Sequence, residues 1–176
     1  MDIFRRPAVA SDLDVITGLI EAVQAELAPE RGGAAWLVSE ARAIPLRPSI
    51  HGDIGAVDVH VSVSGIDDVV LGVAVTRLRE LHDARRVAFI SELVVDPDAR
   101  GVGLGVGLLE DAVAWAKEVG AVGIESTALP GQRATKNFFE AAGMKARLLT
   151  VHASLLPDDS VAHKQPAHEP DDDGGR

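Results

Sequence analysis

The sequence of 176 residues contains neither cysteine nor tyrosine and has no long apolar run. The absence of cysteine excludes a disulfide framework, a thiolate zinc site and a cysteine nucleophile. No stretch approaches the roughly 20 uninterrupted apolar residues that a bilayer-spanning helix needs. Arg5 and Arg6 are not followed by the apolar core of a signal peptide. We therefore expect a cytoplasmic protein without an export signal or a membrane partner.

Basic residues are outnumbered, since 17 lysines and arginines stand against 27 aspartates and glutamates and give a net charge of −10. Nucleic acid binding depends on a basic face that displaces counterions from phosphates, so we expect no nucleic acid partner. Residues 157–176 hold six acidic and two basic residues, which leaves a charge of −6 for the rest of the chain. This charge favours a cationic substrate.

The length and the 47% hydrophobic content fit one domain with a single core. We place this domain at residues 1–156. From Pro157 onward large apolar residues give way to Pro, His and Asp, a composition typical of a disordered, acidic tail. The six histidines show no paired spacing that would suit a metal ion, so we expect no metal site.

In the first half of the chain, apolar periodicity predicts a strand, two helices and a hairpin. Ser11, followed three residues later by Asp14, forms a capping box at the start of the first helix. Prolines and a glycine break the segment after the second helix, where we expect a loop that borders the substrate pocket. The predicted ranges are a strand at 3–8, helices from Ser11 and at 34–44, a loop through Pro45, Pro48 and Gly52, and hairpin strands at 57–63 and 69–78.

The second half alternates strands and helices. The predicted strands are 86–95, 121–128 and 144–155, and the predicted helices run from the glycines near residue 104 to Gly120 and over 134–142. Hairpins followed by alternating strands and helices indicate a single domain of the α+β (mixed α/β) class built on one sheet.

A glycine-rich loop at residues 100–107 joins the predicted strand 86–95 to the helix after it. Backbone N–H groups in such a loop are uncrowded and lack partners within the helix, so they can surround a phosphate at the positive end of the helix dipole. The alternative is a tight connection that merely needs small residues. Two well-known phosphate loops do not fit: the P-loop lysine and its Ser or Thr are missing, and the third glycine of G-x-G-x-x-G falls on Val106 or Leu108.

The loop does match R-x-x-G-x-G, formed by Arg100, Gly103 and Gly105. With E-L-x-V-x-P before it at 92–97 and F-F-E followed by G-M at 138–144, it resembles the acetyl-CoA signature of the GNAT superfamily of N-acetyltransferases. The resemblance covers residues 86–150 closely and the first helix loosely. It implies a mostly antiparallel central sheet that splays at the CoA site, with helices on both faces. Residues 29–55 lie outside it, and we expect them to determine substrate choice.

The resemblance also implies roles for individual residues. Backbone groups of Leu93 and Val95 would pair with the amides of the pantetheine arm as an added strand would, and an N–H near Val94 would polarise the thioester carbonyl. Asn137 on the short helix would contact the arm. The pyrophosphate would be held by Arg100 and by the backbone amides of Gly101, Val102, Gly103, Leu104 and Gly105.

One position departs from the family pattern. Family members often carry a tyrosine after the phenylalanine of the short helix, where it is thought to protonate the departing thiolate, but this chain has Phe139 there. Because a thiol has a pKa near roughly 8.5, its thiolate is a tolerable leaving group without a strong acid. Water, Ser126 or Thr127 can assist instead.

Glu92 is a polar residue on an otherwise apolar strand, between Ile90 and Val94. A carboxylate at this position can act as a general base that removes a proton from an amine, directly or through water. An edge glutamate paired with an arginine is the alternative, and the sequence leaves both open.

We therefore predict direct transfer of an acetyl group from acetyl-CoA to a primary amine in a ternary complex, without a metal. The alternative function is an acyl-CoA-binding sensor or partner-binding module with weak or no catalysis, which the missing tyrosine favours. The sequence leaves open the identity of the amine-bearing acceptor, another acyl donor such as succinyl-CoA, and assembly as a homodimer.

Overall fold

The computed structural model describes residues 2–153 and 155, in two units at 1–144 and 145–176 that we treat separately. The first unit contains every helix and strand among the described residues. The predicted tail at 157–176 lies outside the described residues. In the part of the chain that the structure describes, no helix combines the length and apolar character that crossing a bilayer requires.

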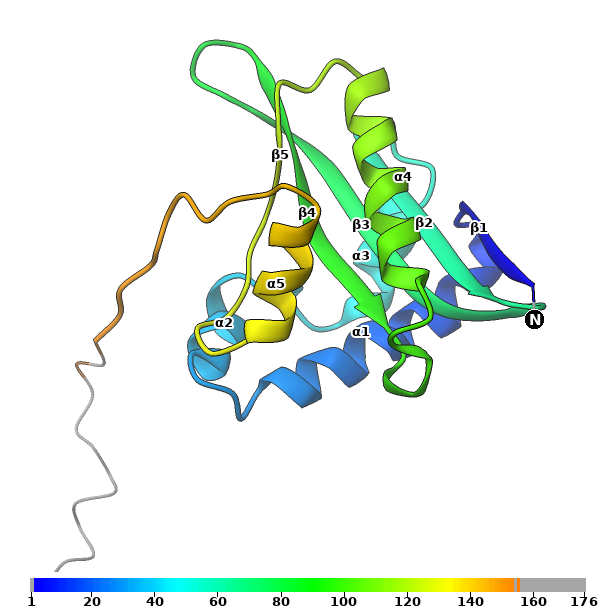
Figure 1. Ribbon diagram of the computed structural model, residues 1–176, viewed down its shortest axis with the longest axis horizontal. Helices are drawn as coiled ribbons and strands as arrows, with labels where there is room; N and C mark the ends of the chain where they lie inside the picture. The colour runs from blue at the N-terminus through cyan, green and yellow to red at the C-terminus, as the bar shows by residue number, and fades with distance from the viewer. Residues whose placement is uncertain (1, 154, 156–176) are drawn as a thin grey trace, which may run out of the picture. The chain divides into compact units, whose positions relative to one another are not determined.

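The first unit is built on a five-stranded sheet with the strands in chain order (Figure 1). Neighbouring strands are antiparallel except the last pair, in which β5 runs parallel to β4. The strands are β1 (Ile3–Pro7), β2 (Val59–Ile66), β3 (Val69–Glu80), β4 (Arg86–Val95) and β5 (Ile124–Ser126). The mixed class and the mostly antiparallel sheet are thereby confirmed.

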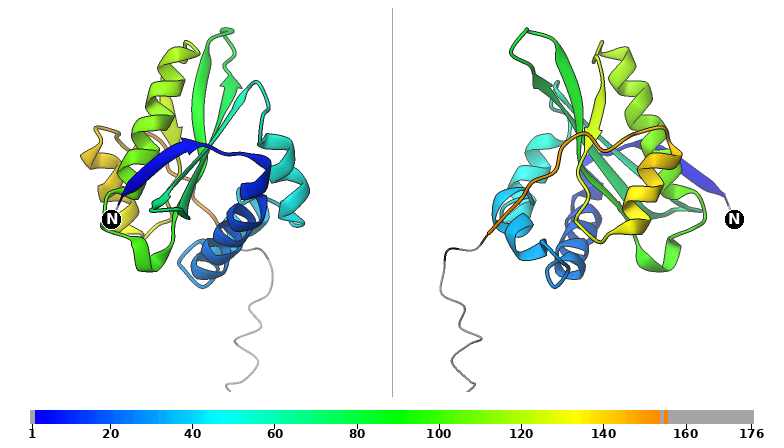
Figure 2. Two further views of the ribbon diagram at one scale, coloured as in Figure 1. Left: turned by 90° about the vertical axis from the view of Figure 1, so that its right-hand side faces the viewer. Right: turned by 60° about the vertical axis from the view of Figure 1, so that its left-hand side comes forward.

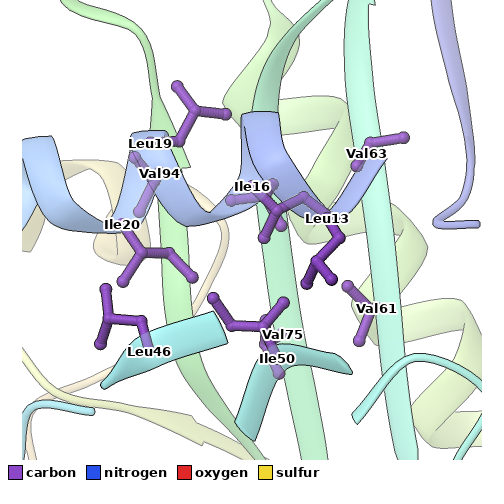
Figure 3. Packing of buried hydrophobic residues seen from close by; sticks show 11 residues of the cluster. Leu13, Ile16, Leu19, Ile20, Leu46, Ile50, Val61, Val63, Val75 and Val94 are labelled. Carbon is purple, nitrogen blue, oxygen red and sulfur yellow. The ribbon is translucent and has the colours of Figure 1, made fainter. Parts of the chain in front are cut away.

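Helices cover both faces of this sheet (Figure 2). On one face, α1 (Leu13–Leu27) and α3 (Leu46–Asp53) pack their apolar side chains onto β2, β3 and Val94 of β4. Figure 3 shows Ile16 and Ile20 of α1 beside Ile50 of α3 and Val75 of β3. On the other face, Leu109 and Ala112 of α4 (Leu104–Glu118) pack against Ile90. Two short helices complete the unit: α2 (Gly33–Ser39) and α5 (Arg133–Ala141).

The side of β4 that faces β5 is only partly paired. The three residues of β5 pair with Ala88 to Ile90 and no further. In the described chain, residues 92–95 of β4 have a strand partner on the β3 side alone, and Ser91 has none on either side. A β-bulge lies where the pairing to β5 stops: Glu92 and Ile90 face consecutive residues of β3, so Ser91 is the extra residue. The ladder between β4 and β5 thus stops in the segment where the family resemblance implies a splay.

The start of the first helix differs from the prediction. The chain forms a short 3₁₀ turn at Ala10–Asp12 before α1 begins at Leu13. Asp12, not Asp14, caps the turn by accepting a hydrogen bond from the Val9 N–H at 2.8 Å. Asp12 is the better acceptor because Arg6 pairs with it through both carboxylate oxygens, at 2.6 and 2.9 Å, and holds it in place.

The predicted loop through Pro45, Pro48 and Gly52 is wrong, because α3 occupies most of it. Pro48 is the third residue of the helix, in the first turn, where a backbone N–H has no intrahelical partner to lose. Burial of Leu46 and Ile50 then stabilises the helix against the sheet. The preceding helix is shorter than predicted and ends at Ser39, not at residue 44.

The strand predicted at 144–155 is also wrong for the described residues of that range, which form neither helix nor strand. Its apolar side chains, Leu148, Leu149, Val151 and Leu155, are each at least 84% exposed. An alternating pattern stabilises a strand only when a neighbouring strand and a covered face are available. The strand predicted at 121–128 is also shorter, since β5 covers only residues 124–126, although Val122 and Gly123 hydrogen bond to Arg86 and Ala88 of β4.

Candidate active site

The glycine-rich loop lies between the C-terminal end of β4 and the first turn of α4 (Figure 1). A 3₁₀ turn at Pro97–Ala99 follows β4 and is closed by Asp96, whose side chain accepts from the Asp98 N–H at 3.0 Å. Gly101 and Gly103 have φ values of 86° and 98°, in the left-handed region that glycine tolerates best. These two residues reverse the chain so that α4 starts directly behind β4.

The backbone N–H groups of this loop are free to bind an anion. The first hydrogen bond of α4 runs from the Gly107 N–H to the Gly103 carbonyl at 3.0 Å. Among the described residues, none accepts from the N–H groups of residues 101–106. Consecutive free N–H groups at the N-terminus of a 15-residue helix suit a phosphate. These free groups include the N–H groups of Gly101, Val102, Gly103, Leu104 and Gly105, whose role in holding a pyrophosphate stays a prediction.

Arg100 is committed to a different partner in this structure. Its Nη1 and Nη2 atoms donate to the two carboxylate oxygens of Glu26 on α1, at 3.0 and 2.7 Å, and its Nε donates to the Val95 carbonyl at 3.2 Å. The hydrogen bond to Glu26 raises the pKa of Arg100 against the effect of burial, and the same bond lowers the pKa of Glu26. Three of the five N–H groups of the guanidinium are thus used, whereas the backbone amides of residues 101–106 are free.

The exposed edge of β4 and the start of α4 meet at Gly105. A methyl group at this position would lie 3.5 Å from Val95 Cγ2, 3.6 Å from Phe138 Cε2 and 3.8 Å from Leu93 Cδ2. The loop, the unpaired part of β4 and helix α5 therefore surround one region. Asn137, the neighbour of Phe138 in α5, is exposed, and its side chain has no hydrogen bond among the described residues, so no contact ties it to the loop.

Glu92 is held by an arginine that the sequence analysis did not single out. Arg42, between α2 and α3, donates from Nε to Glu92 Oε1 at 2.8 Å and from Nη2 to Oε2 at 3.1 Å. The two side chains are only 7% and 10% exposed. Pairing with an arginine was one of the two interpretations left open for Glu92. It accounts for the residue's place on β4 and leaves its chemical role to be tested.

The ion pair extends into a network of four charged side chains. Arg42 Nη1 lies 2.7 Å from Asp53 Oδ2 at the end of α3, and Arg77 Nη2 on β3 donates to the same oxygen at 2.9 Å. Burial lowers the pKa of Arg42, but its hydrogen bonds and charge interactions with Glu92 and Asp53 raise it overall. Arg42 therefore stays charged, and its positive charge holds α3 and β4 together.

Ser91 also contacts Glu92 and was missed by the sequence analysis. Its hydroxyl donates to Glu92 Oε2 and lies 3.3 Å from the Val75 carbonyl oxygen. A β-bulge gives no local sequence signal, so no pattern pointed to this residue. Ser126, suggested as a proton donor, instead gives its hydroxyl hydrogen bond to the Ile90 carbonyl at 3.1 Å. Phe139, which replaces the expected tyrosine, packs with Phe138 against the apolar cluster of Ile90.

Two further observations delimit the site. A cavity of about 270 Å³ lies between α1 and the ends of β3 and β4, lined by residues that include Val15, Gly18, Val70 and Val94. Val95 to Pro97 and Arg100 also line it, so the cavity borders the start of the glycine-rich loop from the face of the sheet that α1 covers. Over the residues that the structure describes, no group of three or more His, Cys, Asp or Glu side chains could hold a metal ion.

The comparisons with known proteins agree with this geometry. Residues 34–144 match the model of the acetyltransferase (GNAT) family, which therefore extends into the segment 29–55 that the motifs left out. A search of the curated proteins finds no match.

Solved structures with the same fold include a mutant of the BH1408 protein from Bacillus halodurans, with 22% identity, a TM-score of 0.75 and coverage of 87% of this chain and 99% of that one. An acetyltransferase from Trypanosoma brucei has 20% identity, a TM-score of 0.63 and coverage of 88% and 100%. The aminoglycoside N-acetyltransferase AAC(6')-Iy, in complex with the bisubstrate analogue CoA-S-monomethyl-acetylneamine, has 18% identity, a TM-score of 0.65 and coverage of 88% and 99%. The family model spans more than half of the sequence, and the chain belongs to the acetyltransferase (GNAT) family.

Proposed function

We propose that this protein transfers an acetyl group from acetyl-CoA to a primary amine of an acceptor molecule. The observation that carries the proposal is the row of free N–H groups at residues 101–106 beside the unpaired edge of β4 at residues 91–95. The first suits a pyrophosphate, and the second suits an extended chain of amides such as the pantetheine arm. A CoA ester carries both groups in one molecule.

The rate of the reaction depends mainly on how the enzyme positions the two substrates. In our proposal the backbone of Leu93 and Val95 aligns the arm, and an N–H near Val94 polarises the thioester carbonyl. Glu92 serves as the base that accepts the proton of the amine. The amine nitrogen forms a bond to the carbonyl carbon, the carbon–sulfur bond breaks, and CoA leaves as the thiolate. This chemistry needs no metal.

The acceptor is proposed to be cationic. The chain carries a net charge of −10, and charge of one sign raises the local concentration of ligands of the opposite sign. AAC(6')-Iy, which has the same fold, is an aminoglycoside acetyltransferase. Aminoglycosides and polyamines are therefore the first acceptor classes to test, together with peptides that offer an N-terminus or a lysine.

A second candidate function is an acyl-CoA-binding module with weak or no catalysis. Phe139 favours it, because this side chain occupies the place of a tyrosine that would donate a proton and is instead packed in an apolar cluster. The ion pair in which Arg42 bonds both carboxylate oxygens of Glu92 also favours a binding module, because it occupies the proposed base. Such a module would bind acetyl-CoA with the same loop but would not release CoA.

One experiment separates the two candidates. Release of free thiol from acetyl-CoA is followed with sisomicin, spermidine, and peptides bearing either a free N-terminus or a lysine, each with a no-acceptor control. We expect acceptor-dependent thiol release with at least one amine and recovery of the N-acetylated product by mass spectrometry. Saturable acetyl-CoA binding without thiol release above the control for any of these amines would favour the binding module.

A further inference from the structure

Glu92 cannot easily meet a substrate amine directly. Both of its oxygens accept hydrogen bonds from Arg42, and the side chain is 10% exposed. A general base must come within about 3.2 Å of the proton it removes, or reach it through one intervening group. The contacts of Glu92 therefore call for an intermediary between its carboxylate and the acceptor.

Ser91 is placed to be that intermediary. Its hydroxyl donates directly to Glu92 Oε2. As the extra residue of the β-bulge it has no partner residue on β3, and it is the first residue of β4 beyond the pairing with β5. The hydroxyl carries one proton and two lone pairs, so it can accept from an amine while it donates to the carboxylate.

Resting on the proposed acetyl transfer, we propose that Ser91 is a catalytic proton relay between the acceptor amine and Glu92. The protonated acceptor amine gives a proton to Ser91 Oγ, and the original Ser91 proton passes to Glu92 Oε2. The neutral nitrogen then bonds to the thioester carbon, the carbon–sulfur bond breaks, and its electron pair leaves with the CoA sulfur. The thiolate takes the second proton from the nitrogen, and Glu92 returns its proton to water, which restores the starting state.

The charged network can accommodate a proton on Glu92. Arg42 loses part of its attraction to Glu92 at that moment, and a buried cation without a counter-charge is costly. Asp53, however, lies 2.7 Å from Arg42 Nη1 and keeps the guanidinium paired. Arg77 bonds the same Asp53 oxygen from the side of β3 and fixes its position. Asp53 thus acts as a positioning residue for the relay.

The test compares Ser91→Ala with Ser91→Thr, which keeps a hydroxyl, and with Thr17→Ala as a matched control. The Thr17 hydroxyl bonds only the Leu13 carbonyl within α1, far along the chain from β4. All variants are assayed by thiol release with the panel amine that the wild type acetylates fastest, from pH 6 to pH 10. The thermal shift produced by CoA is measured in parallel to verify folding and donor binding.

We expect Ser91→Ala to lower kcat by about 10²-fold at neutral pH, within the usual range for general acid–base catalysis. The loss should shrink at high pH, where the amine is already neutral, while Ser91→Thr and Thr17→Ala stay near wild type. Full kcat in Ser91→Ala across the pH range would overturn the relay but leave acetyl transfer standing. Loss of the CoA shift in Ser91→Ala would also overturn it, because the hydroxyl would then support the strand. Absence of turnover by the wild type with every amine would refute both proposals.

Discussion

Arg42 and Glu92 are fifty residues apart in the sequence and form a two-point ion pair, with Nε–Oε1 and Nη2–Oε2 distances of 2.8 and 3.1 Å. The pair joins the segment between α2 and α3 to the strand that splays from β5. A buried carboxylate on this strand is thereby fixed in orientation beside the edge at which we place the thioester. Such preorganisation is what positioning catalysis requires.

Glu92→Gln should lower kcat by about 10² to 10⁴, because it keeps the shape of the side chain but removes the proton acceptor. CoA affinity should change little, since the cradle at residues 101–106 is untouched, and activity should recover partly at high pH. The kcat of the variant and of the wild type is measured by thiol release from pH 6 to pH 10. An unchanged kcat over the whole range would show that the amine arrives neutral and that Glu92 has only a structural role.

Gly103→Val should abolish stabilisation by CoA. A β-branched side chain in a left-handed conformation is strained and places bulk beside the free amides. Gly120→Val is the matched control, because Gly120 also has a positive φ, 72°, and open space around it, but follows the opposite end of α4. In a thermal-shift series, the control should lose stability yet keep its response to CoA. Equal thermal shifts with CoA in the two variants would show that the loop only connects β4 to α4 and does not bind CoA.

The same series tests selectivity, since CoA and acetyl-CoA should raise the melting temperature of the wild type whereas ATP and NAD should not. The loop lacks the lysine of the P-loop and the third glycine of the dinucleotide motif. A shift with ATP as large as that with CoA would contradict the assignment.

Stability near Asp12 should depend on pH in a defined direction. The hydrogen bond from Arg6, opposed by burial and aided by the Val9 N–H, lowers the pKa of Asp12 below its ordinary value of 3.8. The unfolded chain therefore binds more protons than the native state in acid. The stabilisation that the Arg6–Asp12 pair gives the folded state is complete above the ordinary pKa of Asp12, and it is lost as the pH falls through the lowered pKa of the folded state. Urea denaturation should show Asp12→Asn less stable than wild type at pH 6, with a difference that narrows towards pH 3. A difference that stays constant would contradict the pairing.

Removal of residues 157–176 should leave the melting temperature and CoA binding essentially unchanged. This prediction comes from sequence composition, because a segment so poor in large apolar residues has little to contribute to a core. A loss of several degrees on truncation would contradict it.

The sequence predicted those parts of the fold that clear proline and glycine signals bound. The strand at Arg86–Val95 was predicted with its observed bounds, and the helix after the glycines was confirmed because its apolar residues follow one face throughout. Helix α3 was not predicted because a proline in a helix interior breaks the helix, whereas Pro48 lies in the first turn, where it is tolerated. Local signals are weakest where packing decides the outcome.

The candidate site likewise combines local features, which the sequence can predict, with long-range contacts, which it cannot. The amide cradle is a local feature of consecutive residues and could be predicted, whereas the pairing of Arg42 with Glu92 depends on how distant segments meet. The commitment of Arg100 to Glu26 on α1 has the same origin. The motif alone could not show that the guanidinium already has a carboxylate partner.

Hydrogen exchange measured by mass spectrometry, with and without saturating CoA, tests the central claim most directly because it needs no knowledge of the acceptor. We predict slower exchange in peptides covering residues 91–106, where the free edge of β4 and the free amides of the loop would gain hydrogen-bond partners. Peptides from α3 should be unaffected. Protection confined to peptides from α1, with residues 91–106 unchanged, would contradict the assignment of this loop and strand as the CoA site.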